Sequence, residues 1–408
     1  MGGTMPVSPL APASFPALPV IKGVRFAAAA AGVKYQGRTD VMLAVMDSGT
    51  AVAGVFTRSK TRSAPVLDCQ AKLGGAADAG AAILVNSGNS NAFTGHYGQT
   101  SVAEITSAAA AQTGIPAERV FTASTGVIGE PLPVDKILAV LGDAKADLKE
   151  DNWKLAAEGI LTTDTRLKGA SAQIEIGGET ITITGISKGS GMIQPNMATM
   201  LGYVATDAKI AQPLLQQLLT NSTNRSFNRI TVDSDTSTND SCILAATGAS
   251  GVEVSSDEDI ATFAQAFDQV MVELAHAIVR DGEGATKFIT IAVDKAAAQK
   301  EALDVAFTVA HSPLVKTALF ASDANWGRIL AAVGRAGVEN LDIDALQIYL
   351  DDVCIVENGG RAAGYTEEAG SAVMAQEDIR IRIVLNRGDV SETVWTTDLS
   401  HDYVSINA

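Results

Sequence analysis

The sequence predicts a mixed α/β or α+β protein. Short apolar runs typical of buried strands alternate with longer stretches typical of helices along the whole chain. No segment of roughly 20–50 residues recurs at a fixed interval, so solenoids and propellers are not expected. Strand-like runs return late in the chain, where antiparallel hairpins are expected. The pattern alone does not choose between the α/β and α+β classes.

In the first half of the chain, apolar runs at 41–46 and 82–85 predict buried strands, and a turn-rich stretch at 86–91 follows the second. An Ala-rich segment at 101–112 predicts a helix. Residues 179–186 alternate Thr and Ile with a period of two, which predicts a half-buried strand.

The second half contains three clear helix patterns. One covers about 257–279, and Ser255 with Glu258 three residues later forms a capping-box pattern before it. Ser312 and Pro313 provide an N-cap and a first helical residue for the next, which is expected to continue through Phe320, and the third covers 325–336 with Gly337 as its stop. Strands are expected at 287–293, 346–356 and 379–385.

Length and charge limit the architecture and the partners. A chain of 408 residues is long for one compact core, so two lobes are expected. Hydrophobic residues make up 47% and charged residues 19%, which predicts a folded chain. Lys plus Arg is 30 and Asp plus Glu is 46, giving a formal charge of −16. Such a surface disfavours nucleic acid and anionic membranes as partners, but a local cation can still bind an anionic substrate.

The remaining composition predicts a soluble, cytoplasmic protein. The few cysteines lack CxxC spacing, which is typical of a reducing compartment, and the four histidines have no metal-ligand spacing, so no zinc site is expected. Residues 1–19 lack a basic segment before an apolar one, which predicts a flexible tail rather than a signal peptide. No apolar run reaches the roughly 18 residues of a membrane span.

The most informative stretch is glycine-rich and follows the strand expected at 179–186. It reads KGSGMI at 188–193 and PNMATML at 195–201. Neither GxxxxGK[ST] nor GxGxxG is present, so phosphate binding has little support. The remaining structural interpretation is a turn between strands whose glycines take positive φ.

This stretch resembles the processing site of the ornithine acetyltransferases, also called glutamate N-acetyltransferases. Other blocks resemble the same family, in family order from about residue 20 to the C-terminus. They are NSGN at 86–89, TASTGVIG at 122–129, TTDT at 162–165, RITVDSDTSTND at 229–240, DGEGATK at 281–287 and DANWGR at 323–328.

The resemblance implies that the chain cuts itself between Ala198 and Thr199. The Thr199 hydroxyl attacks the preceding carbonyl, and the resulting ester is hydrolysed to an α chain, residues 1–198, and a β chain, residues 199–408. The cut exposes the α-amine of Thr199, with a pKa of about 8 as for free amino termini. That amine can act as general base for its own hydroxyl.

The resemblance also implies roles for other residues. The Thr125 hydroxyl and the Gly126 N–H would stabilise the oxyanion. Lys188 would bind the substrate α-carboxylate, and Thr162 would contact substrate. Taken alone, Thr125 and Gly126 could lie in an ordinary loop, Lys188 could be a solvated loop lysine, and Thr162 could be an N-cap or turn residue.

Two further substrate contacts are implied near the C-terminus. Glu283 would contact an ammonium group of ornithine, although a Gly-flanked turn closing the long helix is an alternative. Asn407 resembles a substrate-contacting Asn. The family usually has a Ser or Thr a few residues beyond that Asn, whereas this sequence ends at Ala408, which leaves that contact open.

The implied reaction is a ping-pong acetyl transfer in arginine biosynthesis. Thr199 takes the acetyl group from N²-acetylornithine, and glutamate then accepts it. No metal and no bound cofactor is expected, and the residues do not decide whether acetyl-CoA is also a donor. The implied fold is a layered α/β sandwich of sheets flanked by helices, like that of N-terminal-nucleophile enzymes, with a second, smaller lobe. The α and β chains are expected to pair further into a heterotetramer.

Two alternatives remain at the level of sequence. A self-processed amidase or aminopeptidase would use water in place of glutamate as acceptor. A catalytically silent relative would act as a binding or structural subunit, but in such a protein Thr199 or the Thr125–Gly126 pair should be degraded, and all three residues are intact.

Overall fold

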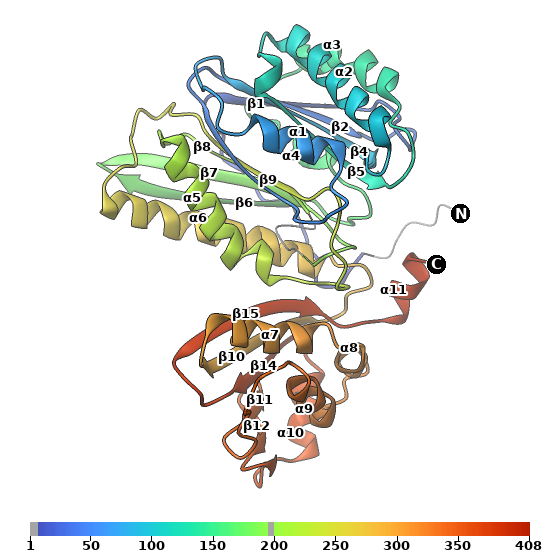
Figure 1. The fold of residues 1–408 in the computed structure, drawn as a ribbon, viewed down its shortest axis with the longest axis vertical. Helices are drawn as coiled ribbons and strands as arrows, with labels where there is room; N and C mark the ends of the chain where they lie inside the picture. Colours follow the sequence, from blue (N-terminus) through green and yellow to red (C-terminus); the bar gives the residue numbers. More distant parts are fainter. Residues whose placement is uncertain (1–6, 195–199) are drawn as a thin grey trace. The chain divides into compact units, whose positions relative to one another are not determined.

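The computed structural model describes residues 7–194 and 200–408, which divide into two compact units (Figure 1). The large unit comprises Ala13–Asn228 and Asp235–Ile278. The small unit comprises residues 7–12, Arg229–Ser234 and Val279–Ala408.

The strands of the large unit form two sheets among the described residues. One has the order β1-β2-β4-β5 and the other the order β3-β9-β8-β7-β6. The strands of the first sheet are β1 (Val24–Ala29), β2 (Val41–Met46), β4 (Ala81–Asn89) and β5 (Val120–Val127). Those of the second are β3 (Ala51–Phe56), β6 (Lys168–Ile176), β7 (Glu179–Lys188), β8 (Leu201–Thr206) and β9 (Ser241–Ala246).

The helices of the large unit are α1 (Ala64–Lys72), α2 (Gly95–Thr113), α3 (Val134–Ala146), α4 (Trp153–Gly159), α5 (Gln212–Arg225) and α6 (Asp257–Arg280), with short 3₁₀ turns η1 (Ala117–Arg119) and η2 (Phe227–Arg229). Helices α1 and α4 contribute Val66 and Trp153 to the buried cluster between the two sheets, and the other four cover the outer faces. Helices α2 and α3 pack on the first sheet, where Ile105 and Ile137 meet Leu43 in one buried cluster. Helices α5 and α6 lie along the second sheet (Figure 1). The layers are therefore helix, sheet, sheet, helix.

The main core of the large unit lies between its two sheets. Phe26 and Val85 of the first sheet are buried in the same cluster as Ile186, Tyr203 and Ile243 of the second. Burying apolar side chains from both faces stabilises the pair of sheets by roughly 25 cal/mol per Å² of apolar surface removed from water. This packing fixes the positions of the strand ends that carry the candidate site.

Two pairings of the large unit position that site. Strands β7 and β8 are antiparallel neighbours in which Lys188 pairs with Leu201, so residues 189–200 connect two paired strand ends. Strands β4 and β5 are parallel, with Gly88 opposite Gly126. Strand β8 also pairs in parallel with β9, with Leu201 opposite Ser241.

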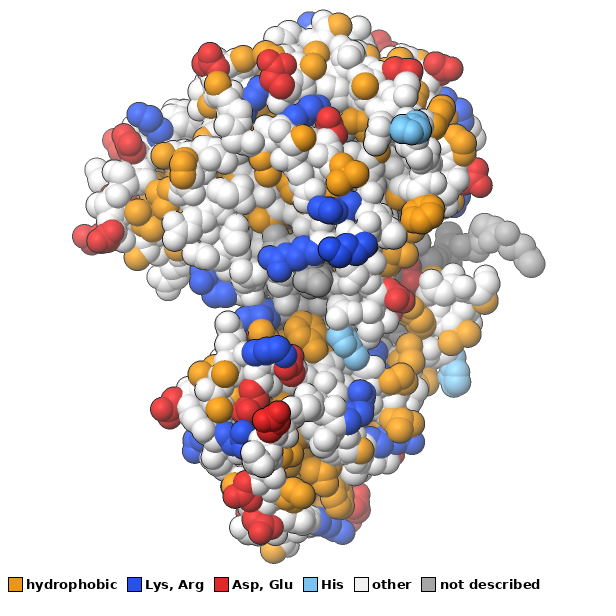
Figure 2. Space-filling view, in the orientation of Figure 1, with side chains coloured by type: hydrophobic (Ala, Val, Ile, Leu, Met, Phe, Trp, Pro, Cys, Tyr) orange, Lys and Arg blue, Asp and Glu red, His pale blue; other side chains and the backbone are white. Residues whose placement is uncertain are grey.

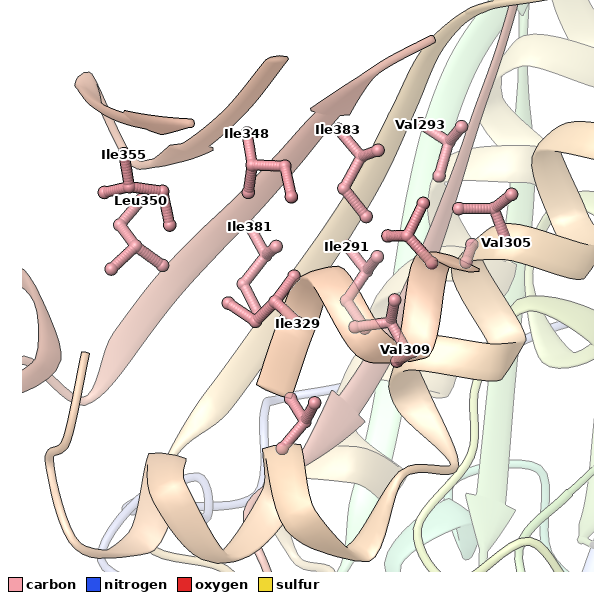
Figure 3. Packing of buried hydrophobic residues seen from close by; sticks show 14 of the residues in the cluster. Ile291, Val293, Val305, Val309, Ile329, Ile348, Leu350, Ile355, Ile381 and Ile383 are labelled. Carbon is pink, nitrogen blue, oxygen red and sulfur yellow. The ribbon is translucent and has the colours of Figure 1, made fainter. Parts of the chain in front are cut away.

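The small unit contains a sheet of order β13-β12-β11-β14-β10-β15. Its strands are β10 (Phe288–Ala296), β11 (Gln347–Leu350), β12 (Val353–Glu357), β13 (Gly360–Arg361), β14 (Asp378–Val384) and β15 (Val390–Thr397). Its helices are α7 (Gln299–Ala310), α8 (Pro313–Phe320), α9 (Trp326–Gly334), α10 (Glu367–Met374) and α11 (His401–Ile406). Figure 3 shows Ile291, Ile348 and Ile381 of the sheet facing Val305 of α7 and Ile329 of α9 in the buried core.

The fold confirms the predicted class: layered sheets flanked by helices, with a second, smaller unit. The strand predicted at Val41–Met46 and the helix predicted at Pro313–Phe320 have the expected bounds, and the Ser312 side chain caps the latter by accepting from the Val315 N–H. The proposed boundary at residue 198 does not coincide with the division into compact units, because β8 lies between β7 and β9 in one sheet.

Several local expectations were wrong. Residues 86–89 continue strand β4 instead of forming a turn, since their side chains find hydrogen-bond partners in the interior. The stretch 346–356 divides into two strands at a turn. The cap of α6 is Ser256, whose hydroxyl accepts from the Asp259 N–H, rather than Ser255. Helix α9 ends at Gly334, before the glycine expected to stop it.

The N-terminal residues that sequence analysis assigns to a flexible tail make several contacts where they are described. Within the small unit, the Ser8 hydroxyl donates to the Arg280 carbonyl over 2.6 Å and Leu10 is buried. Within the large unit, Phe15 and Leu18 pack against the core between the sheets.

Candidate active site

The predicted cleavage site falls in the connection between β7 and β8. Ala198 and Thr199 lie outside the described residues, but the residues on either side are positioned. The carbonyl of Gln194 accepts a hydrogen bond from the Thr236 hydroxyl over 3.0 Å. The carbonyl of Met200 accepts one from the Ser241 N–H, also over 3.0 Å. One segment, residues 236–241, therefore contacts both described ends of the connection.

Thr125 and Gly126, the predicted oxyanion-hole residues, lie near the end of strand β5 rather than in a loop. Gly126 has φ +129°, and a Cβ there would lie 2.4 Å from the carbonyl carbon of Gly88. A side chain at 126 is therefore excluded both by conformation and by space. Thr125 is buried, whereas Gly126 is exposed, so the accessible part of this strand end is its backbone.

Asn239 joins this strand end to the same 236–241 segment. Its side-chain amide donates to the Ser124 carbonyl over 2.7 Å and to the Ser90 carbonyl over 2.5 Å. The Ser124 hydroxyl in turn donates to the Asn86 side-chain oxygen over 2.6 Å. This buried amide fixes the segments around Ser90 and Ser124, because leaving either buried carbonyl without a hydrogen bond would be costly. We call residues 189–200, which contain the predicted cleavage site, the cleavage loop. Hydrogen bonds of the 236–241 segment thus fix Thr125 and the described ends of this loop relative to each other within the large unit.

Lys188 and Thr162, two of the predicted substrate contacts, lie next to each other. Lys188 is the last residue of β7 and is 9% exposed, so it is a buried lysine rather than a solvated one. Its ammonium group donates to the Thr162 hydroxyl over 3.1 Å. The Thr162 carbonyl accepts from the guanidinium of Arg38 over 3.4 Å. An ammonium held at a strand end can bind a carboxylate.

Asp164 lies beside this pair with a fully buried side chain. It forms an ion pair with Lys168 over 2.6 Å and accepts the Gly189 N–H over 2.7 Å. Burial alone raises the pKa of its carboxyl, but the charges of Lys168 and Lys188 and the hydrogen bonds from Lys168 and Gly189 lower that pKa to about 2. Asp164 is therefore ionised throughout the physiological range.

The other two predicted substrate contacts lie in the small unit and contact each other. The Asn407 side-chain amide donates to a carboxylate oxygen of Glu283 over 2.8 Å. Glu283 is 9% exposed and lies between α6 and β10. The next residue, Gly284, has φ +69°, and a Cβ there would lie 2.5 Å from the Tyr403 nitrogen of α11. The turn and the C-terminal helix therefore pack closely around this carboxylate.

The described parts of the chain contain no group of three or more His, Cys, Asp or Glu side chains placed to hold a metal ion. Within residues 7–194 and 200–408, none of the helices has the length and apolarity needed to cross a membrane. Acidic and basic side chains are interspersed over the face that Figure 2 shows.

Comparison with known proteins identifies the family. The model of the ArgJ family matches residues 25–408, nearly the whole chain. The chain belongs to the ArgJ family.

Its relatives in this family are similar over their full length. A Ruegeria pomeroyi protein called arginine biosynthesis bifunctional protein ArgJ is 58% identical over 402 residues, covering 98% of both chains. The protein of that name from Pseudomonas fluorescens is 54% identical over 396 residues, covering 96% of this chain and 97% of its own.

Two solved structures carry related descriptions. ArgJ of Bacillus halodurans has 40% identity and a TM-score of 0.48, covering 50% of this chain and 97% of its own. An ornithine acetyltransferase of Mycobacterium tuberculosis, solved in complex with ornithine, has 34% identity and a TM-score of 0.38, covering 44% of this chain and 94% of its own.

Two residues of the site, Asn239 and Asp164, have no role predicted from the sequence. Each lies inside a block that resembles the family, and each connects its block to another part of the fold. Both side chains are buried and bond to backbone groups far away in sequence. A polar side chain inside a block dense in Thr, Ser and Asp gives little sign of burial, so their roles emerge only from the fold.

Proposed function

We propose that this enzyme transfers an acetyl group from N²-acetyl-L-ornithine to L-glutamate, forming ornithine and N-acetylglutamate in arginine biosynthesis. Membership of the ArgJ family over residues 25–408 supports the reaction. The observation that carries the site assignment is the 236–241 segment, which bonds to Gln194, Met200 and, through Asn239, to Ser124 beside Thr125.

The first step of the proposal is self-cleavage. The Thr199 hydroxyl attacks the Ala198 carbonyl carbon, the amide nitrogen leaves as the α-amine of Thr199, and an ester remains. Water hydrolyses that ester and releases the carboxylate of Ala198. The products are residues 1–198 and 199–408, which stay together because β7 and β8 are neighbours in one sheet.

Acetyl transfer then follows the same chemistry twice. The Thr199 amine takes the hydroxyl proton as the oxygen attacks the acetyl carbon of N²-acetylornithine, and the proton passes to the departing α-amine of ornithine. The glutamate α-amine next attacks the acetyl-threonine ester and regenerates the hydroxyl. At each tetrahedral stage the Thr125 hydroxyl and the Gly126 N–H donate to the oxyanion, each worth about 10²–10³ in rate.

Binding is assigned to the charged residues. Lys188 with Thr162 binds the α-carboxylate that both substrates carry, and Glu283 with Asn407 binds the side-chain ammonium of ornithine. Every step uses groups of the chain, the substrates and water. The relatives are called bifunctional, and acetyl-CoA is the donor that would make glutamate acetylation independent of N²-acetylornithine. We place the enzyme in the cytoplasm as a heterotetramer of the two cleaved chains.

Two measurements test the proposal. On a denaturing gel, the purified wild type should run as two fragments and Thr199→Ala as one intact chain. With N²-acetylornithine, product formation should require glutamate and yield N-acetylglutamate. A single full-length band from active wild type would overturn the cleavage step. Acetate release that ignores glutamate would identify a hydrolase instead, and absence of any turnover would identify a binding subunit.

A further inference from the structure

Asp164 contacts two residues of its own segment and the end of strand β7 through its two carboxylate oxygens. Oδ1 accepts from the Gly189 N–H over 2.7 Å and from the Lys168 ammonium over 2.6 Å. Oδ2 accepts from the Thr162 N–H over 3.2 Å. The side chains of Asp164 and Lys168 are both fully buried. These hydrogen bonds involve an ionised acceptor in the interior, where they are strong.

Each of the three residues that Asp164 contacts lies next to a part of the proposed active site. Thr162 also accepts a hydrogen bond from the Lys188 ammonium, so Asp164 fixes the backbone of the residue that orients this lysine. Gly189 is the first residue after β7 and begins the connection that leads to Thr199. Lys168 begins β6, which pairs with β7 along its length, Lys168 itself lying opposite Ser187.

From these contacts we infer that Asp164 is a positioning residue that aligns the cleavage loop and the carboxylate-binding pair Lys188–Thr162 at the same time. The inference rests on the proposed function. Asp164 touches neither the reacting atoms nor the substrate in this account; it acts through Gly189 and Thr162.

Lys168 compensates the buried negative charge of Asp164. It is the ion-pair partner of Asp164 at 2.6 Å, and its Coulombic effect on Asp164 exceeds that of Lys188. A lysine in this position compensates the buried carboxylate, so the Lys188 ammonium stays directed at the Thr162 hydroxyl. Without Lys168, the carboxylate would attract Lys188 more strongly and away from Thr162.

The arrangement requires a carboxylate and not merely a polar side chain of the same shape. All three partners of Asp164 are donors: two N–H groups and one ammonium. An asparagine has one acceptor oxygen and one NH₂ group, so the NH₂ must face a donor at one of the two positions. Asp164→Asn therefore releases either Gly189 and Lys168 or Thr162.

The experiment compares Asp164→Asn with Asp207→Asn in the full-length chain. Asp207 is a matched control because its carboxylate accepts one backbone N–H of β7, that of Thr182, over 2.9 Å. Thr182 lies near the beginning of β7, whereas Gly189 follows its end. We would measure the half-time of self-cleavage on gels, then KM and kcat after processing is complete, and Tm for each protein.

Asp164→Asn should slow self-cleavage about tenfold and raise KM for both substrates about tenfold, with a smaller change in kcat, as expected for loss of a charge-assisted hydrogen bond. Asp207→Asn should cleave and bind like the wild type. If Asp164 had a purely structural role, Asp164→Asn would lower Tm but leave the cleavage half-time and KM unchanged well below Tm, and that result would overturn the inference.

A second variant covers the case in which Asp164→Asn does not fold. Lys168→Met keeps the acceptor of Gly189 and Thr162, and should raise KM for both substrates while cleavage still proceeds. Wild-type KM in Lys168→Met would overturn the account of Lys168 and, if Asp164→Asn is insoluble, the inference as a whole. A wild-type chain that neither cleaves nor transfers acetyl would overturn the proposed function, and the inference with it.

Discussion

Gly126 lies opposite Gly88 in the parallel pairing of β4 and β5, and a Cβ on Gly126 would come within 2.4 Å of the Gly88 carbonyl carbon. The two strands therefore approach more closely here than any side chain allows. Gly126 is nevertheless exposed at this end of β5, where its backbone is accessible.

Gly126→Ala should therefore be damaging in two ways. Its φ of +129° and the contact with Gly88 should lower the free energy of unfolding by about 2 kcal/mol or more. Displacement of the N–H should lower kcat by about 10². Urea denaturation and steady-state kinetics check the two effects.

The control is Gly142→Ala in the middle of α3, where the nearest atom to a new Cβ is 4.0 Å away. Alanine there should stabilise the protein by up to about 1 kcal/mol through helix propensity. Wild-type kcat in Gly126→Ala would exclude this residue from the oxyanion hole.

The sequence was sufficient where one pattern decides the structure. Strand Val41–Met46 was predicted with its observed bounds because an unbroken apolar run that is buried on both faces ends at Asp40 and Asp47. The family blocks likewise contain two predicted site residues, Lys188 and Thr162, that the fold brings into hydrogen-bond contact.

Sequence patterns were insufficient to predict the structure where polar residues are buried. Asn86 to Asn89 look like a turn, but the Asn86 side chain bonds to the Asn89 carbonyl over 2.8 Å and the strand continues. Asp164 and Gly189 are distant in sequence, and no local pattern indicates that one bonds to the other. Such a contact depends on how the segment before β6 folds back onto the end of β7, which no local sequence pattern specifies.

Thr162→Val tests whether the Thr162 hydroxyl orients Lys188. Valine has the same shape but cannot accept the hydrogen bond of 3.1 Å from the ammonium group. KM for both substrates should rise about tenfold or more, as expected for one hydrogen bond to a charged group, worth about 1.5–3 kcal/mol. Thr162→Ser, which keeps the acceptor, should be close to wild type in the same assay. Equal KM values for the valine and serine variants would remove the hydroxyl from substrate binding.

Lys316 provides a pH-dependent prediction in the small unit. Its ammonium group is buried, donates to the Thr396 hydroxyl over 3.0 Å and also contacts the Thr397 carbonyl. Burial lowers its pKa from 10.5 to about 8, against the opposing charges of Asp398 and Asp233. Between these two pH values the unfolded chain binds more protons at Lys316 than the folded chain does.

The sign follows from that difference in proton binding. The penalty for burying the charged lysine is constant below about pH 8 and is relieved as pH rises from 8 towards 10.5. The unfolding free energy of the wild type minus that of Lys316→Met should therefore increase across this window, by up to roughly 3 kcal/mol. Urea denaturation at several pH values measures it. Lys300→Met, at an exposed position of α7, is the control, and a flat difference for Lys316→Met would contradict the argument.

Glu283→Gln tests how the two substrates are distinguished. The Glu283 carboxylate is assigned to the side-chain ammonium of N²-acetylornithine, whereas glutamate has a carboxylate at the end of its side chain. Loss of the charge should raise KM for N²-acetylornithine about tenfold or more and change KM for glutamate much less. Ornithine release and N-acetylglutamate formation measure the two half-reactions separately. Glu301→Gln, which removes a carboxylate of the same unit paired with Arg387, is the control.

Asn407→Ala tests the residue that donates a hydrogen bond to the Glu283 carboxylate. The Asn407 amide donates to Glu283 over 2.8 Å and to the Tyr403 carbonyl over 3.0 Å, so it links the carboxylate to α11. If Asn407 acts by holding Glu283, its loss should raise KM for N²-acetylornithine by a smaller factor and with the same substrate preference. Combined with Glu283→Gln, it should then add little, because two residues in one contact are not additive. A double variant whose effects multiply would instead mean that Asn407 contacts substrate independently of Glu283.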